Sequence, residues 1–135
     1  MSQKKVLIVD DSKLMRIIIK KILSSDDNFK VTSEAGNGIE ALTEIEKDIP
    51  DLIFLDIEMP EMDGVEALKE IRAKYSTKVV IVSSVAQMGS SRAAEVNQLG
   101  ADAIVEKPGG AVDPTLIKEK GSEFITIARK VSGLD

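Results

Sequence analysis

Cysteine, histidine and tryptophan are absent from the 135-residue sequence, and aromatic residues make up only 3% of it. Without cysteine the chain has no disulfide, no thiolate nucleophile and no thiolate metal site. Without histidine it has neither a Ser-His-Asp or Cys-His mechanism nor a histidine-based zinc site. The chemistry of this chain must therefore rely on carboxylates, hydroxyls and amines.

Long apolar runs and an excess of basic residues are also missing. No run has the length of a membrane-spanning helix, and no hydrophobic signal segment follows the first five residues, so we expect a cytoplasmic protein. The 23 acidic residues outnumber the 18 basic ones, which gives a formal net charge of −5 and a pI near 4.9. This balance argues against a nucleic-acid surface. We expect partners that are neither nucleic acids nor membranes.

The length and composition fit one globular domain over residues 1–135. Hydrophobic residues make up 43% of the chain and charged residues 30%, enough apolar material for one core. Five short and nearly unbroken apolar runs predict strands at 5–9, 29–35, 52–55, 78–83 and 103–106. Amphipathic stretches between them predict helices at 12–23, 38–47, 64–74, 90–99 and about 113–131. This alternation predicts an α/β fold with a parallel sheet covered by helices on both faces.

Local signals support the helix starts. Asn37 with Glu40, and Asp63 with Glu66, have the spacing at which a capping side chain and the third helical residue satisfy each other's free amides. Gly121, inside the last helical stretch, weakens the prediction of one continuous helix there.

Polar residues stand at the predicted strand ends, where function gathers in parallel sheets. Asp10 and Asp11 follow the first strand, Asp56 the third and Lys107 the fifth, and Ser83 ends the fourth. Three carboxylates at one edge repel one another, and a hard cation such as Mg²⁺ relieves the repulsion. An ammonium and a hydroxyl would then bind phosphate, and a carboxylate would act as the nucleophile for a phosphoryl group.

Each of these residues also has a purely structural interpretation. Asp10 and Asp11 lie just before a predicted helix, whose dipole favours acidic residues at that end. Asp56 could simply follow a strand, and Lys107 could be a solvated lysine before a proline. Their joint placement favours the functional interpretation, because accidental motif matches become rare when four occur in order.

Four segments carry a resemblance to bacterial response-regulator receiver domains. They read VLIVDDS at 6–12, LDIEMPEMDG at 55–64, IVSS at 81–84 and GADAIVEKP at 100–108. The resemblance extends to about residue 131. It implies a flavodoxin-like (CheY-like) sheet with strand order 2-1-3-4-5.

By position, the resemblance also implies roles for the candidate site residues. Asp56 would be the phosphoacceptor and a metal ligand, Asp11 would bind Mg²⁺ directly and Asp10 through water. Glu58 would offer its backbone carbonyl to the metal. The same residue stands two positions after the phosphoacceptor, and we hypothesise that its charge tunes the lifetime of the acyl phosphate.

The remaining site residues would contact the phosphoryl group and transmit the switch. Ser83 would contact a phosphoryl oxygen, and Lys107 would pair with it, followed by a cis bond to Pro108. Many receivers carry an aromatic residue where this chain has Ile104. The aromatic part of the switch described for the family is therefore not available here.

The resemblance implies a partner on each side of the reaction. A sensor histidine kinase, CheA-like, would donate the phosphoryl group, and an unknown downstream protein would respond to it. The chain would be a monomer or a weak dimer and would catalyse only its own phosphorylation and dephosphorylation. Segments 83–89 and 107–110 are similar to receivers of chemotaxis, including those of CheB methylesterases. That esterase needs a catalytic domain with a histidine, so we expect a stand-alone receiver or a piece of a longer regulator.

Two other functions remain open from the residues. A Mg²⁺-dependent phosphohydrolase also uses an aspartate nucleophile on a parallel sheet, often with a second carboxylate where Glu58 stands. A degenerate receiver would bind partners without phosphorylation, although all the expected site residues are present.

Two further sets of charged residues have structural interpretations. Lys13, Arg16, Lys20 and Lys21 of the first predicted helix are interpreted as a solvated face, with docking of an acidic partner as the alternative. Asp63 is interpreted as a turn and cap residue.

Overall fold

The computed structural model describes residues 3–84, 89–107 and 114–134. For residues 114–120 it describes only the backbone. The strands are β1 (Lys4–Val9), β2 (Phe29–Ala35), β3 (Leu52–Asp56), β4 (Lys78–Ser83) and β5 (Ala103–Glu106). The helices are α1 (Lys13–Leu23), α2 (Gly38–Lys47), α3 (Gly64–Lys74), α4 (Ser91–Gln98) and α5 (Pro114–Val131). All the predicted elements are confirmed, because no bound differs by more than one residue from its prediction.

The strands form one parallel sheet in the order β2-β1-β3-β4-β5, as the resemblance implied. All carboxyl ends therefore lie at the same edge. The central pair, β1 and β3, is in register at Val9 and Leu55, so the residues that follow these two stand side by side. This order brings the ends of the first and third strands together although about 45 residues separate them in sequence.

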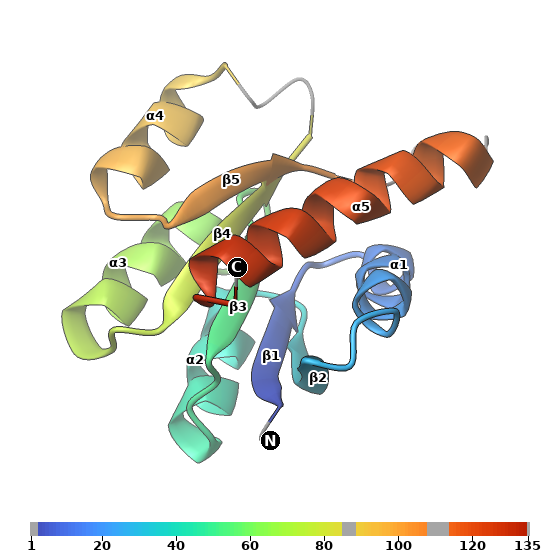
Figure 1. Ribbon diagram of the computed structural model, residues 1–135. Helices are drawn as coiled ribbons and strands as arrows, with labels where there is room; N and C mark the ends of the chain where they lie inside the picture. The colour runs from blue at the N-terminus through green and yellow to red at the C-terminus, as the bar shows by residue number, and fades with distance from the viewer. Residues whose placement is uncertain (1–2, 85–88, 108–113, 135) are drawn as a thin grey trace.

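Helices cover both faces of the sheet, which explains why the strands are almost continuously apolar. Alternate residues of β1 point in opposite directions, as strand geometry requires. Leu7 and Val9 pack with the buried residues of α2, α3 and α4, whereas Val6 and Ile8 pack with those of α1 and α5. Figure 1 shows α1 and α5 on one side of the sheet and α2, α3 and α4 on the other. The result is a three-layer sandwich with a core on each side of the sheet.

Side-chain caps fix the helix starts near the edge of the sheet at which the strands have their carboxyl ends. Asn37 accepts a hydrogen bond from the Glu40 amide at 2.9 Å, and Asp63 accepts one from the Glu66 amide at 3.0 Å. Both predicted N-caps are thus confirmed, whereas the Glu40 side chain accepts from the Gly36 amide at 2.9 Å and not from the backbone amide of Asn37. Ser12 caps α1 in the same way, with its hydroxyl oxygen 3.2 Å from the Met15 amide. These caps satisfy amides that have no partner within their own helix.

Gly121, which weakened the prediction of one continuous helix, does not interrupt the last helix. Helix α5 runs continuously from residue 114 to residue 131. A Cβ at Gly121 would meet the Ile22 side chain of α1, with Cγ1 at 3.4 Å, so the glycine lies where the two helices pack closely. Tertiary packing therefore outweighs the low helix propensity of glycine at this position.

Within the described part of the chain, no helix has both the length and the apolar character needed to span a membrane.

Candidate functional site

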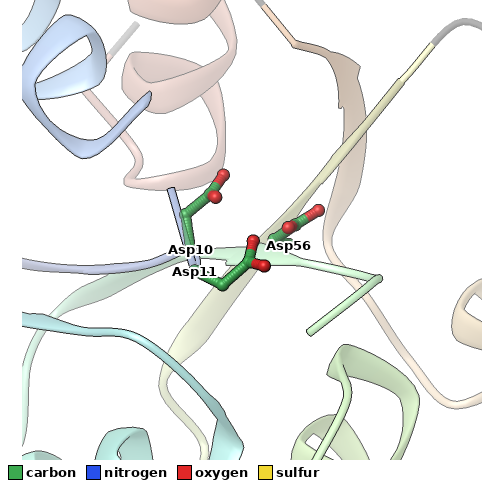
Figure 2. A group of neighbouring side chains, drawn as sticks. All are labelled: Asp10, Asp11 and Asp56. Carbon is green, nitrogen blue, oxygen red and sulfur yellow. The ribbon is translucent and has the colours of Figure 1, made fainter. Parts of the chain in front are cut away.

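Three carboxylates meet at the carboxyl edge of the sheet. Asp10 and Asp11 follow β1, and Asp56 is the last residue of β3. One oxygen from each lies within 4.8 Å of the others, and Figure 2 shows the three carboxyl groups gathered at these neighbouring strand ends. Asp10 and Asp56 are buried, at 1% and 2% exposure, whereas Asp11 is exposed. The predicted convergence of these residues is present in the structure.

Lys107 reaches this cluster from the end of β5. Its Nζ lies 3.2 Å from Oδ1 of Asp56 and 3.7 Å from Oδ2 of Asp10. Its backbone amide donates to the carbonyl of Ser83 at 2.9 Å, which ties the end of β5 to the end of β4. The ammonium therefore stands directly beside the expected phosphoacceptor. The bond to Pro108, expected to be cis, lies outside the described residues.

Burial raises the pKa of Asp56 to about 6. The nearby charge of Asp10 adds to the effect, and Lys107 only partly opposes it. Burial likewise raises the pKa of Asp10, although the Ser12 amide donates to its Oδ1 at 2.9 Å. Desolvation disfavours the charged form of a carboxyl group, and a second carboxylate disfavours it further. The surroundings therefore disfavour the ionised form of both carboxyl groups, even with Lys107 beside them.

The lysine responds in the opposite direction. Burial alone would lower the pKa of Lys107, but the charges of Asp56 and Asp10 outweigh burial and hold it above its ordinary value. The side chain therefore remains a cation, which suits a ligand for a phosphoryl oxygen.

A small cavity of about 100 Å³ opens beside Asp56. Ser83, at 1% exposure, lines it together with Glu58 and Lys107. Because one water occupies about 30 Å³ in the liquid, the cavity has room for a group of a few heavy atoms. The Ser83 hydroxyl donates only a long hydrogen bond, 3.3 Å, to the carbonyl of Ser84. All five predicted side chains of the site are thus brought to one place, and Glu58 lies on its wall.

The loop between β3 and α3 is fixed by a close approach of two backbones. The Gly64 amide donates to the Ile57 carbonyl at 2.8 Å, and a Cβ at Gly64 would lie 2.1 Å from the carbonyl oxygen of Asp56. Only glycine fits there without moving the strand end. Position 64 therefore controls the backbone that carries Asp56.

Asp63 has the structural role that the sequence predicts, and a second contact that it does not. Besides capping α3, its carboxylate forms an ion pair with Arg92 of α4. Arg92 joins the loop that follows Asp56 to the helix that follows Ser83. No spacing in the sequence could have revealed this contact, because the two residues lie on separate elements.

Arg16 departs from the interpretation of the α1 basic residues as a solvated face. Its guanidinium is half-buried, donating from Nη1 to the carbonyl oxygen of Asp10 at 2.5 Å and from Nε to Oε1 of Glu34 at 3.1 Å. Lys20, on the same helix face, donates to the other oxygen of Glu34 at 3.1 Å. Arg16 therefore contacts the backbone of a residue of the carboxylate cluster, and the sequence analysis missed this role.

The donor set fits a hard divalent cation such as Mg²⁺. Oδ2 of Asp10 and Oδ2 of Asp56 are buried without a hydrogen-bond donor in the described part of the chain. Buried carboxylate oxygens without a hydrogen-bond donor are costly, and cations that prefer oxygen ligands remove that cost. The exposed Asp11 leaves the cluster open to solvent on one side.

Comparisons with known proteins agree with this geometry. The family model of the response regulator receiver domain matches residues 6–118, and the chain belongs to this family. Two relatives named protein-glutamate methylesterase/protein-glutamine glutaminase come from Syntrophomonas wolfei and Bacillus licheniformis. The first is 39% identical over 98% of this chain and 38% of its own length. The second is 46% identical over 84% of this chain and 32% of its own length. The chain thus spans about a third of the length of these curated relatives.

Solved structures give the same result for the fold. The response regulator domain of Thermotoga maritima CheB superposes with a TM-score of 0.85 at 36% identity, covering 98% of both chains. A chain in the crystal structure of the P1 domain of CheA3 in complex with CheY6 from R. sphaeroides gives 0.81 at 40% identity, over 98% of this chain and 99% of that one. The expected resemblance to CheY-like and CheB receivers of two-component chemotaxis systems is confirmed.

Proposed function

We propose that this chain accepts a phosphoryl group on Asp56, with Mg²⁺, and thereby changes its affinity for a downstream protein. One observation carries the proposal most directly. Asp56 combines a cation 3.2 Å from one carboxylate oxygen with a buried second oxygen that has no hydrogen-bond donor among the described residues. A carboxylate placed in this way can attack phosphorus with one oxygen and bind a metal with the other.

The proposed transfer is a single displacement at phosphorus. A carboxylate oxygen of Asp56 attacks the phosphorus of a phosphohistidine, and the new P–O bond forms as the P–N bond breaks. The donor imidazole leaves with the electron pair of that bond. Lys107 pairs with an oxygen of the transferred group, and the Ser83 hydroxyl donates to another, which exchanges its long bond to Ser84 for a charge-assisted one.

Mg²⁺ would be held by the side chains of Asp56 and Asp11, by Asp10 through water and by the backbone carbonyl of Glu58. Bound there, it would offset the negative charge that develops on the phosphoryl oxygens. The protein's own contribution is to keep the ligands together, with Asp10 bonded to the Ser12 amide through Oδ1 while Oδ2 faces the site without a hydrogen-bond donor among the described residues.

The proposed phosphodonor is a histidine kinase of the CheA type. A chain 40% identical to this one belongs to a structure described as the P1 domain of CheA3 in complex with CheY6. We propose a cytoplasmic monomer or weak dimer in which residues 1–135 form one receiver domain. Its only catalysis would be its own phosphorylation and dephosphorylation, and any methylesterase activity would belong to other parts of the longer relatives.

Incubation with acetyl phosphate and Mg²⁺, followed by intact mass measurement, tests the proposal. The wild type should gain one phosphoryl group, and EDTA or Asp56→Asn should prevent the gain. Asp51→Asn is a matched control, because this exposed carboxylate lies at the start of β3 rather than at its end. An adduct that persists in Asp56→Asn would place the acceptor elsewhere, and no adduct on the wild type would favour a degenerate receiver.

The same reaction separates a receiver from a phosphohydrolase that uses Glu58 as its acid or base. A receiver stops at about one phosphoryl group per chain once the donor is removed. A hydrolase would release phosphate from stable phosphate esters over many turnovers at constant protein concentration. Sustained turnover of such esters would contradict the proposed function.

A further inference from the structure

Arg16 binds the backbone of a proposed metal ligand rather than any side chain of the site. Its Nη1 donates to the carbonyl oxygen of Asp10 at 2.5 Å, and its Nε donates to Oε1 of Glu34 at 3.1 Å. Arg16 belongs to α1, Glu34 to the edge strand β2, and Asp10 to the turn after β1. One planar guanidinium thus joins three elements, which a lysine with its single nitrogen cannot do in the same way.

Glu34 holds this guanidinium in place. Its second oxygen accepts a hydrogen bond from Lys20 at 3.1 Å, so both carboxylate oxygens are engaged. Burial opposes the charge of Glu34, but Lys20 and Arg16 together keep the pKa of this carboxyl below its ordinary value. Arg16 is also the more buried of the two cations, with 18% of its side chain exposed against 54% for Lys20.

The contact matters because Asp10 is otherwise held, among the described residues, by the Lys107 ion pair at its Oδ2 and by two hydrogen bonds. Its amide donates to the Ala35 carbonyl at 3.0 Å, and its Oδ1 accepts from the Ser12 amide at 2.9 Å. The bond from Arg16 fixes the remaining backbone group, the carbonyl of the peptide that joins Asp10 to Asp11. Both residues share that peptide plane, so its orientation contributes to where the two consecutive carboxylates point.

We propose that Arg16, braced by Glu34, is a positioning residue that sets the Mg²⁺ affinity of the site formed by Asp10, Asp11 and Asp56. The inference rests on the proposed function, because it takes Mg²⁺ as the cation bound there. Residues that orient metal ligands through hydrogen bonds typically change metal affinity about 10- to 100-fold when they are replaced. We expect a loss of that size for Arg16→Gln.

Charge alone predicts the opposite result. Removing a cation near an acidic site lowers the repulsion felt by Mg²⁺ and should tighten binding. Positioning predicts weaker binding, because the peptide between Asp10 and Asp11 is released. The sign of the change in affinity therefore distinguishes the two explanations without reference to phosphorylation.

Isothermal titration calorimetry of Mg²⁺ into the unphosphorylated protein measures this affinity. Lys20→Gln is the matched control: it removes a cation from the same helix face and the other contact to Glu34, yet no contact to Asp10. We expect Arg16→Gln and Arg16→Lys to bind Mg²⁺ more weakly than the wild type and Lys20→Gln to change little. Wild-type or tighter binding by Arg16→Gln, or full recovery in Arg16→Lys, would overturn the inference.

A second variant covers the case in which Arg16→Gln does not fold. Glu34→Ala releases the guanidinium from β2 without changing α1, and it should also weaken Mg²⁺ binding. In a double-mutant cycle, Glu34→Ala should add little once Arg16 is replaced, because its effect acts through Arg16. Additive losses would contradict the coupling. Circular dichroism in EDTA checks that each variant is folded before the titration.

Failure of this inference and failure of the proposed function give different results. A wild type that binds no Mg²⁺ would contradict the proposed metal site itself. A wild type that binds Mg²⁺ normally, with an unchanged affinity in the Arg16 and Glu34 variants, would contradict the positioning role alone.

Discussion

The charge of Asp56 should destabilise the metal-free protein, and Asp56→Asn should therefore stabilise it in EDTA. Burial raises the pKa of this carboxyl to about 6, whereas its ordinary value is 3.8. Each pKa unit corresponds to about 1.4 kcal/mol, so the ionised group costs the folded state about 3 kcal/mol. The attraction to Lys107 is already included, because it is one of the influences on that pKa.

The pH dependence of this cost has a definite sign. Below about pH 4 the carboxyl is protonated in both the folded and the unfolded protein, and it contributes no penalty. Between about pH 4 and 6 the unfolded chain ionises while the folded one does not, so stability falls as pH rises. Above pH 6 the full penalty remains. Asn cannot ionise, so its advantage over Asp should be largest at pH 8 and should disappear near pH 4.

Thermal unfolding in EDTA at several pH values measures the effect. For a chain of this size about 4 °C corresponds to each kcal/mol, so the melting temperature of Asp56→Asn should exceed that of the wild type by roughly 10 °C at pH 8. Added Mg²⁺ should nearly cancel this difference, because it binds only the intact site and contributes about 2.7 kcal/mol at a hundred times its Kd. A variant that is no more stable than the wild type at pH 8, or a difference independent of pH, would refute the reasoning.

Substitutions at Gly64, Lys107 and Glu58 test the surroundings of Asp56, with Gly121→Ala as a control. Gly64→Ala should destabilise the protein and abolish phosphorylation, because its Cβ would lie 2.1 Å from the Asp56 carbonyl oxygen. Gly121→Ala, whose Cβ would have its nearest contact at 3.4 Å, should be neutral or stabilising by up to about 1 kcal/mol. Urea unfolding of both variants separates steric conflict from helix propensity. Lys107→Ala should slow labelling by acetyl phosphate about 100-fold or more, followed by intact mass, because it removes the cation beside the acceptor. Glu58→Gln should lengthen the lifetime of the acyl phosphate if its charge assists attacking water, and unchanged dephosphorylation would remove that role.

The sequence predicts the elements and the site because both depend on local patterns. Unbroken apolar runs predict strands buried on two faces, and Asn37 and Asp63 mark helix starts through side chains that reach only three residues ahead. Parallel strands place their carboxyl ends at one edge, so the residues after each run must gather there. The positions of Asp10 and Asp56 follow from that rule alone.

Contacts between separate elements could not be predicted in this way. Arg16 is one of four cations on α1, and nothing in its spacing distinguishes it from Lys20, whose side chain stays largely exposed. Its role depends on the distance from α1 to the Asp10 carbonyl, which the packed sheet determines. Gly121 weakened a correct helix prediction for the same reason, because propensity carries no information on the Ile22 side chain against which this glycine packs.

The order of the strands also explains which residue type stands at each strand end. Neighbouring strands lie about 4.8 Å apart, so the short side chains of Asp10 and Asp56, on the adjacent strands β1 and β3, meet without help. Strand β5 is two positions from β3, roughly 10 Å away, and only a long side chain crosses that distance. Lys107 does so and brings its nitrogen within 3.2 Å of Asp56, passing β4, where a short hydroxyl at Ser83 suffices. Side-chain length thus follows from strand order, and an aspartate, a serine and a lysine could not exchange places around the same cavity.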